Sequence, residues 1–68
     1  MMTGEIAKQK REALRFNQKR FAKLLGVHPE TLCRMESSKR ISPYVELIIV
    51  LLDANESNVK LAMERRGV

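Results

Sequence analysis

The spacing of hydrophobic and polar residues along the chain predicts five short helices. Apolar residues recur every three or four positions, which is the period of amphipathic helices rather than of strands. We expect a first helix between residues 3 and 16, followed by helices over about 18–25, 29–37, 43–53 and 56–66. Each helix is preceded by a residue that can cap it, and two of them have a proline in the first turn. These residues are Thr3, Asn17, His28-Pro29, Ser42-Pro43 and Asn55.

The same spacing predicts which side of each helix is buried. In the first helix we expect an apolar face of Ile6, Lys10, Ala13 and Leu14 and an outer face of Lys8, Arg11, Glu12 and Arg15. In the second helix the inward residues are Phe21, Ala22, Leu24 and Leu25, and Phe16 lies in the core just before it. The third helix turns Leu32 and Met35 inward and presents Glu30, Cys33, Arg34 and Ser37 on the opposite face.

One segment, ELIIVLLD at 46–53, is rich enough in β-branched residues to suggest a strand. The Ser-Pro start, the helical neighbours and the lack of a partner strand favour a helix. We expect its core residues to be Val45, Ile48, Ile49, Leu51 and Leu52. The fold class predicted for residues 1–68 is therefore all-α, a compact single-domain bundle of five short helices.

The composition excludes several classes of protein. One cysteine and one histidine among 68 residues allow neither an internal disulfide nor a zinc site, so we expect no cofactor. The start of the sequence lacks the apolar segment of a signal peptide, and the run 47–52 is too short for a bilayer. We expect a cytoplasmic protein with no membrane partner. No nucleophile–base spacing indicates an enzyme, and no small-molecule ligand is evident.

The net charge of +5 is unevenly distributed. Residues 8–40 contain ten Lys and Arg against three Asp and Glu, whereas residues 41–68 contain three against four. Such asymmetry favours a polyanionic partner, although a solvated, solubilising surface would have the same composition.

The most informative stretch is 17–37. Two short helices are joined there by a tight turn at Gly26, where a positive φ needs a residue without Cβ. The second of these helices is short and polar on its outer face, and the surroundings are basic. Together these features predict a helix-turn-helix that reads DNA.

The ordered set Arg11, Asn17-Gln18, Phe21-Ala22, Leu25-Gly26-Val27, Thr31-Leu32, Glu36 and Lys39 resembles the lambda-repressor-like, or Cro/Xre-type, helix-turn-helix family. The resemblance covers about residues 5–54 and implies a prokaryotic or phage-encoded DNA-binding protein. It implies base reading by His28, Pro29, Glu30 and Arg34. It implies phosphate contacts from Gln18, Lys39 and Arg40, to which we add Asn17, Lys19 and Ser37. It also implies a structural salt bridge between Arg11 and Glu36.

Each of these roles has a plainer alternative. Arg34 could be a solvated arginine, Glu30 a partner of the helix dipole, and Arg11 and Glu36 two exposed charges. Two residues depart from the family pattern. His28 replaces the usual Ser or Thr cap, and Ser38 replaces a glycine, so we expect the positive-φ position of that loop to move or to carry strain.

A second apolar stripe marks the helix over 43–53. Tyr44, Leu47, Val50 and Ala54 lie on one side of it, away from the core positions. A small protein is not expected to leave such a stripe in water. We expect these four residues to form the interface of a homodimer built by helices within 43–66. The alternative is a last helix that folds over the stripe through Val59, Ala62 and Met63.

These features predict a sequence-specific double-stranded DNA-binding regulator, an autoregulatory repressor acting as a homodimer on a palindromic operator. Two alternatives stay open. The chain could be an antitoxin that binds a toxin protein and autoregulates its operon. It could also use its helix-turn-helix for protein contacts only.

Overall fold

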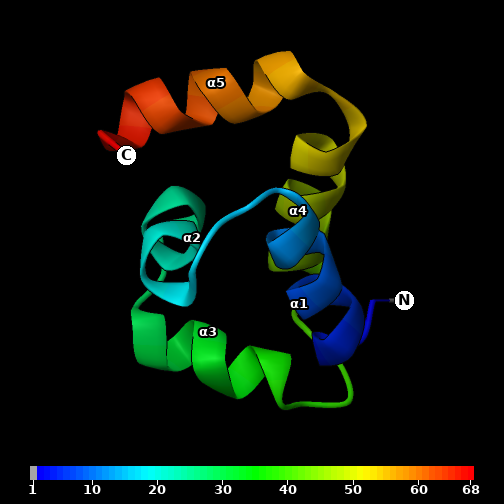
Figure 1. Ribbon diagram of the computed structural model, residues 1–68. Helices are drawn as coiled ribbons and strands as arrows, with labels where there is room; N and C mark the ends of the chain where they lie inside the picture. The colour runs from blue at the N-terminus through cyan, green and yellow to red at the C-terminus, as the bar shows by residue number, and fades with distance from the viewer. Residues whose placement is uncertain (1) are drawn as a thin grey trace.

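The protein folds into five helices without strands over residues 2–68, which are the residues that the computed structural model describes (Figure 1). The helices are α1 (Gly4–Ala13), α2 (Gln18–Leu25), α3 (Pro29–Glu36), α4 (Pro43–Ala54) and α5 (Glu56–Arg66). The predicted all-α fold class is confirmed. The predicted boundaries of the last four helices lie within a residue of the observed ones, since Ser37 caps α3 and α4 extends to Ala54. The first helix, expected between residues 3 and 16, ends at Ala13.

Each helix starts at the cap that its sequence predicts. The five side chains accept hydrogen bonds from backbone N–H groups of the first turn, which otherwise have no partner within the helix. The caps are Thr3, Asn17, His28, Ser42 and Asn55. Pro29 and Pro43 stand in the first turn of α3 and α4, where a missing N–H costs nothing.

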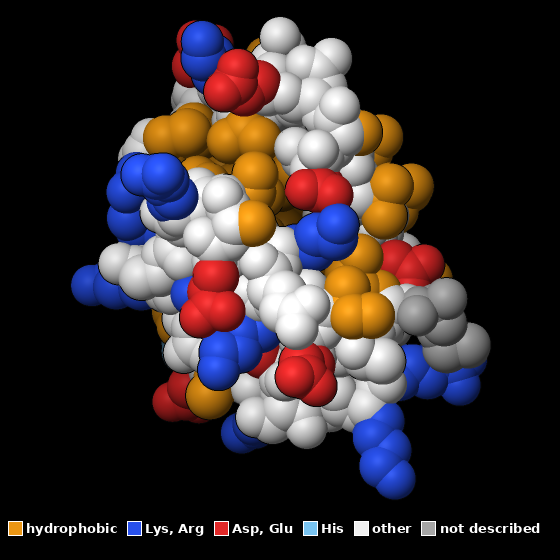
Figure 2. Space-filling model, turned by 45° about the vertical axis from the view of Figure 1, so that its right-hand side comes forward, with side chains coloured by type: hydrophobic (Ala, Val, Ile, Leu, Met, Phe, Trp, Pro, Cys, Tyr) orange, Lys and Arg blue, Asp and Glu red, His pale blue; other side chains and the backbone are white. Residues whose placement is uncertain are grey.

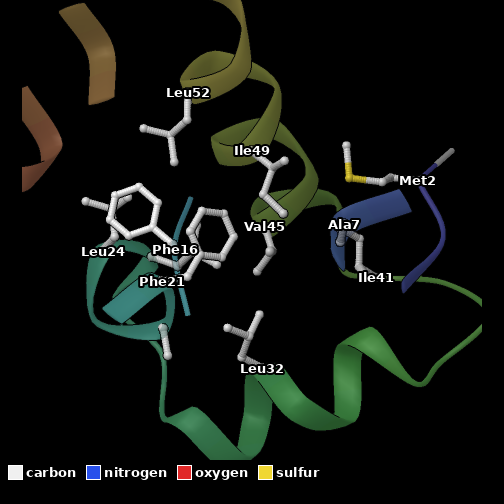
Figure 3. Packing of buried hydrophobic residues seen from close by; sticks show 12 residues of the cluster. Met2, Ala7, Phe16, Phe21, Leu24, Leu32, Ile41, Val45, Ile49 and Leu52 are labelled. Atoms are coloured by element: carbon white, nitrogen blue, oxygen red, sulfur yellow. The ribbon is translucent and has the colours of Figure 1, made fainter. Parts of the chain in front are cut away.

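The core lies where α2, α3 and α4 meet (Figure 3). Phe21, Leu25, Leu32 and Ile49 are the largest fully buried side chains. Phe16 enters from the segment after α1, and its ring centroid is 5.7 Å from that of Phe21. The predicted buried face of α2 and the predicted place of Phe16 in the core are confirmed.

Most of the predicted face of α1 is wrong, although Leu14, just after the helix, packs against the core as expected. Gly4, Ala7 and Arg11 are its buried residues, whereas Ile6 is 40% exposed. The reason is a close approach of backbones: the Gly4 N–H donates to the Ser38 carbonyl at 3.1 Å. A Cβ on Gly4 would lie 2.1 Å from the carbonyl oxygen of Met35. Hydrophobic spacing could not indicate this face, because it consists of a glycine, an alanine and an arginine.

The surface of α4 is divided between the core and solvent. Val45, Ile49 and Leu52 are buried and Ile48 is half-buried, but Leu51 is 50% exposed, so its predicted core position is wrong. Tyr44, Leu47 and Val50 are 64%, 58% and 48% exposed. We call these three residues and the exposed Ala54 the α4 stripe.

Helix α5 does not cover the α4 stripe. It lies across the top of the molecule in Figure 1 and contacts α2 and α4. Its half-buried Val59, Ala62 and Met63 pack against the core cluster instead. The intramolecular lid considered for Leu47 and Val50 is therefore wrong.

The strained backbone position is not at Ser38. Among residues 2–68, the non-glycine residue with positive φ is Arg15, at 65°. It follows α1, where the Phe16 N–H donates to the Arg11 carbonyl and the Arg15 N–H to the Glu12 carbonyl. This arrangement is the helix ending that usually contains glycine.

Within residues 2–68 no helix combines the length and apolar character needed to cross a bilayer.

The contact between Gly4 and the end of α3 generates a stability prediction. Gly4→Ala should lower the free energy of unfolding by about 1–3 kcal/mol, because the new methyl group meets backbone atoms that cannot move independently. Gln9→Ala, at an exposed site of the same helix, should change it by less than about 0.5 kcal/mol. Urea unfolding followed by circular dichroism measures both. Equal effects would mean that the contact is not tight.

Candidate nucleic-acid interface

The turn between α2 and α3 is fixed by Gly26. Its φ is 78°, and its N–H donates to the Lys23 carbonyl, while the Val27 N–H donates to the Ala22 carbonyl at 2.9 Å. A Cβ here would also lie 2.8 Å from a guanidinium nitrogen of Arg66. The arginine side chain is flexible and can move aside, so it is the positive φ that opposes a larger residue here.

Helix α3 starts at an unusual cap. The His28 Nδ1 accepts a hydrogen bond from the Glu30 N–H at 3.3 Å. A ring nitrogen that accepts carries no proton, so the neutral ring has its proton on Nε2. The cap therefore leaves an N–H donor on the other side of an exposed imidazole.

The two sides of α3 differ sharply. Leu32 is buried and Met35 half-buried, whereas Glu30 and Arg34 are exposed. His28 and Pro29 are exposed beside them, so the structure brings all four predicted base-reading residues to one end and one outer face of a short helix. Within residues 2–68, neither Glu30 nor Arg34 forms an ion pair.

A buried polar network holds α3 in place. Arg11 Nε is 2.7 Å from Glu36 Oε2, and Arg11 Nη2 donates to Glu36 Oε1 at 3.3 Å. The two side chains are 9% and 4% exposed. Arg11 Nη1 also donates to the Phe16 carbonyl at 2.8 Å. The expected salt bridge is thus present, and it is buried, not a pair of exposed charges.

Gln18 joins this network from the first turn of α2. Its Nε2 donates to Glu36 Oε1 at 2.9 Å. One carboxylate therefore connects α1, α2 and α3. The phosphate contact expected of Gln18 stays a prediction. Within residues 2–68 the second N–H of its carboxamide has no partner, so it could make that contact.

The loop after α3 is anchored at both ends. The Ser38 Oγ lies 2.8 Å from the Met35 carbonyl oxygen and 2.7 Å from that of Arg40. Ile41 is buried, and its N–H donates to the Met2 carbonyl. Between these anchors Lys39 and Arg40 are exposed, and Ser37 is exposed just before them.

The surface around α3 is basic. Exposed Lys19 and Lys23 lie on α2, and together with Gly26, Val27, His28 and Pro29 they line a depression of about 430 Å³. Lys39 and Arg40 follow the other end of α3. The charge of Glu36 is paired with Arg11, which leaves Glu30 as the exposed acid on α3.

Three features of this surface have no hydrophobic signal in the sequence. They are the close approach at Gly4, the Gln18–Glu36 hydrogen bond and the Ser38 hydroxyl, which lies within hydrogen-bond distance of two carbonyl oxygens. The sequence signals that could have indicated the first and the third were Gly4 at the first helical position and Ser38 in a short loop. Within the part of the chain that the structure describes, no cluster of three His, Cys, Asp or Glu side chains could bind a metal ion.

Because the Arg11–Glu36 pair is buried and the Lys10–Asp53 pair is not, removing the first should destabilise the fold more than removing the second. Glu36→Ala should lower the free energy of unfolding by about 3–5 kcal/mol, because it leaves the Arg11 guanidinium buried and unpaired. The matched control is Asp53→Ala. It removes the Lys10–Asp53 pair, whose side chains are 39% and 38% exposed, and should cost less than about 1 kcal/mol. Urea unfolding measures both, and similar losses would contradict the structural role of the network.

Comparisons of the chain with protein-family models, with curated proteins and with solved structures find no match. The family resemblance of residues 5–54 stays a prediction.

Proposed function

We propose that this protein is a sequence-specific double-stranded DNA-binding regulator. The observation that carries the proposal is the outer face of α3, where a buried network fixes the helix and its exposed side is surrounded by basic side chains. A helix of eight residues is about 12 Å long, and the major groove of B-DNA is about 12 Å wide. The helix and the groove are therefore of matching size.

Arg34 is the principal candidate for base recognition. Its guanidinium has no ion-pair partner within residues 2–68, so both of its N–H edges are available to guanine O6 and N7. His28 would present Nε2–H at the start of the same helix. Pro29 offers apolar contact, for example to a thymine methyl group.

Glu30 would accept a hydrogen bond from cytosine N4. Its carboxylate also stands in the first turn of α3, where the helix dipole favours a negative charge. A carboxylate close to DNA phosphates is unfavourable unless it is paired, so Glu30 would reject sites that lack the matching cytosine.

Phosphate contacts would flank the recognition helix on both sides. Gln18 and Lys19 at the start of α2 supply one set, beside the Asn17 cap. Ser37, Lys39 and Arg40 supply the other. Contacts of this kind position the protein but carry no sequence information.

A homodimer is the second part of the proposal. The α4 stripe is exposed in the single chain, and α5 packs elsewhere. Pairing of two copies through this stripe would remove it from water and relate two α3 helices by two-fold symmetry. The dimer would act by occupying an operator, hence as a repressor, including of its own operon. An antitoxin remains the alternative, because it would use the same DNA surface and add a partner protein.

Selection of bound sequences from random duplex DNA tests the proposal directly. We expect enrichment of a palindrome whose half-sites are separated by about one helical turn, near 34 Å. Binding without any enriched sequence, or no binding at low salt, would refute a sequence-specific regulator.

Two variants should separate base reading from phosphate contact. Arg34→Ala should lose about 1–3 kcal/mol of discrimination at one base pair of the selected site. Lys39→Ala should weaken binding to all sequences alike and reduce the salt dependence of binding. Titrations on the selected site and on random DNA at several salt concentrations measure both. Equal losses on the two DNAs for Arg34→Ala would exclude its reading role.

The dimer depends on the α4 stripe. Leu47→Glu should convert the protein to a monomer, because association would bury a carboxylate in an apolar interface, while the exposed site leaves the fold intact. Leu61→Glu, at an equally exposed leucine of α5, is the matched control and should leave the dimer unchanged. Light scattering at micromolar concentration reports the mass. A wild-type protein that is only monomeric would refute the dimer.

A further inference from the structure

A second surface is formed by an apolar groove between α2, α4 and α5. It encloses about 530 Å³. Leu24, Leu25 and Leu52 are the buried residues of its lining, and the exposed Leu51 and Leu61 belong to α4 and α5. In Figure 2 hydrophobic side chains gather below α5, which lies at the top of the molecule.

This groove is separate from the proposed DNA interface. Helix α5 lies at one end of the molecule and α3 at the other (Figure 1). No residue of α3 lines the groove. A partner seated there would leave the outer face of α3 accessible.

The groove leaves large apolar side chains in water. Leu51 is 50% exposed and Leu61 53% exposed. Helix α5 contributes no fully buried residue and packs only through half-buried ones. Covering Leu51 and Leu61 would therefore remove apolar surface from water and attach α5 more firmly to the bundle.

The charges around the groove select the kind of partner. Arg65 and Arg66 line it, whereas none of its lining residues is Asp or Glu. Leu61 and Arg65 are four residues apart, so they are neighbours on one face of α5. The lining thus combines leucines with guanidinium groups, which suits a ligand that combines apolar side chains with carboxylates.

We propose that the groove binds an acidic amphipathic helix of another protein. Apolar residues at positions i, i+3 or i+4, and i+7 of that helix would lie against Leu51 and Leu61, and its carboxylates would pair with Arg65 and Arg66. Helix α5 has eleven residues and is about 16 Å long, which matches about three turns of such a helix.

A second copy of this chain fits the groove less well. The carboxylates beside the α4 stripe are Glu46 and Asp53. Glu46 accepts a hydrogen bond from the Met2 N–H, and Asp53 is paired with Lys10 at 2.7 Å. Both carboxylates are thus already engaged within their own chain, which favours a different protein as the occupant.

A synthetic helical peptide provides the test. The probe is a fluorescent 16-residue peptide with a leucine stripe flanked by glutamates, and its matched control has lysine in place of each glutamate. Fluorescence anisotropy without DNA should show saturable binding of the acidic peptide and at least about tenfold weaker binding of the basic one. Because DNA is absent, the result is independent of the proposed function.

Variants of the protein locate the binding site. Leu61→Glu should weaken binding of the acidic peptide about tenfold, and Arg65→Glu should reverse the preference between the two peptides. Leu47→Glu, on the α4 stripe, should leave both affinities unchanged. Circular dichroism of each variant establishes that the helices are intact.

Four outcomes would overturn the inference. They are no saturable binding of the acidic peptide, equal binding of the two peptides, loss of binding in Leu47→Glu, and loss of self-association in Leu61→Glu. The last would assign the groove to a second copy of the chain.

Discussion

The rest of the structure depends on the buried ion pair between Arg11 and Glu36. Removing two charges from water is costly, and the cost is offset here because both groups are fully engaged. The Arg11 guanidinium donates to the Glu36 carboxylate through two nitrogens and to the Phe16 carbonyl through the third. Gln18 donates a further hydrogen bond to the same carboxylate. The network therefore sets the positions of α1, α2 and α3 relative to one another.

This constraint explains how so small a chain keeps a rigid outer surface. Leu32 is the fully buried side chain of α3 and Met35 is half-buried, so packing alone would hold this helix through few side chains. Glu36 holds the end of α3, and the His28 cap and Gly26 hold its start. The exposed residues of α3 are consequently presented on a fixed support, which recognition of a defined partner surface requires.

Local chemistry made much of the architecture predictable. Thr3, Asn17, Ser42 and Asn55 act within their own first turn, so their roles depend on few distant residues. The buried face of α2 follows hydrophobic spacing, because its apolar residues are large. The face of α1 does not, since its tight contact uses Gly4 and its buried charge is Arg11. Leu51 follows helical spacing too, but it lines the open groove between α4 and α5 and stays 50% exposed.

The sequence by itself determined the number of helices, their starts, the ends of the last four, and the outer face of α3, because caps, proline and glycine act over a few residues. Only the tertiary structure decided which polar groups share Glu36, that Leu51 stays exposed, and that α5 packs beside a groove instead of over the α4 stripe. Those outcomes depend on distances between segments far apart in the chain. The spacing of hydrophobic residues within one helix cannot predict those distances.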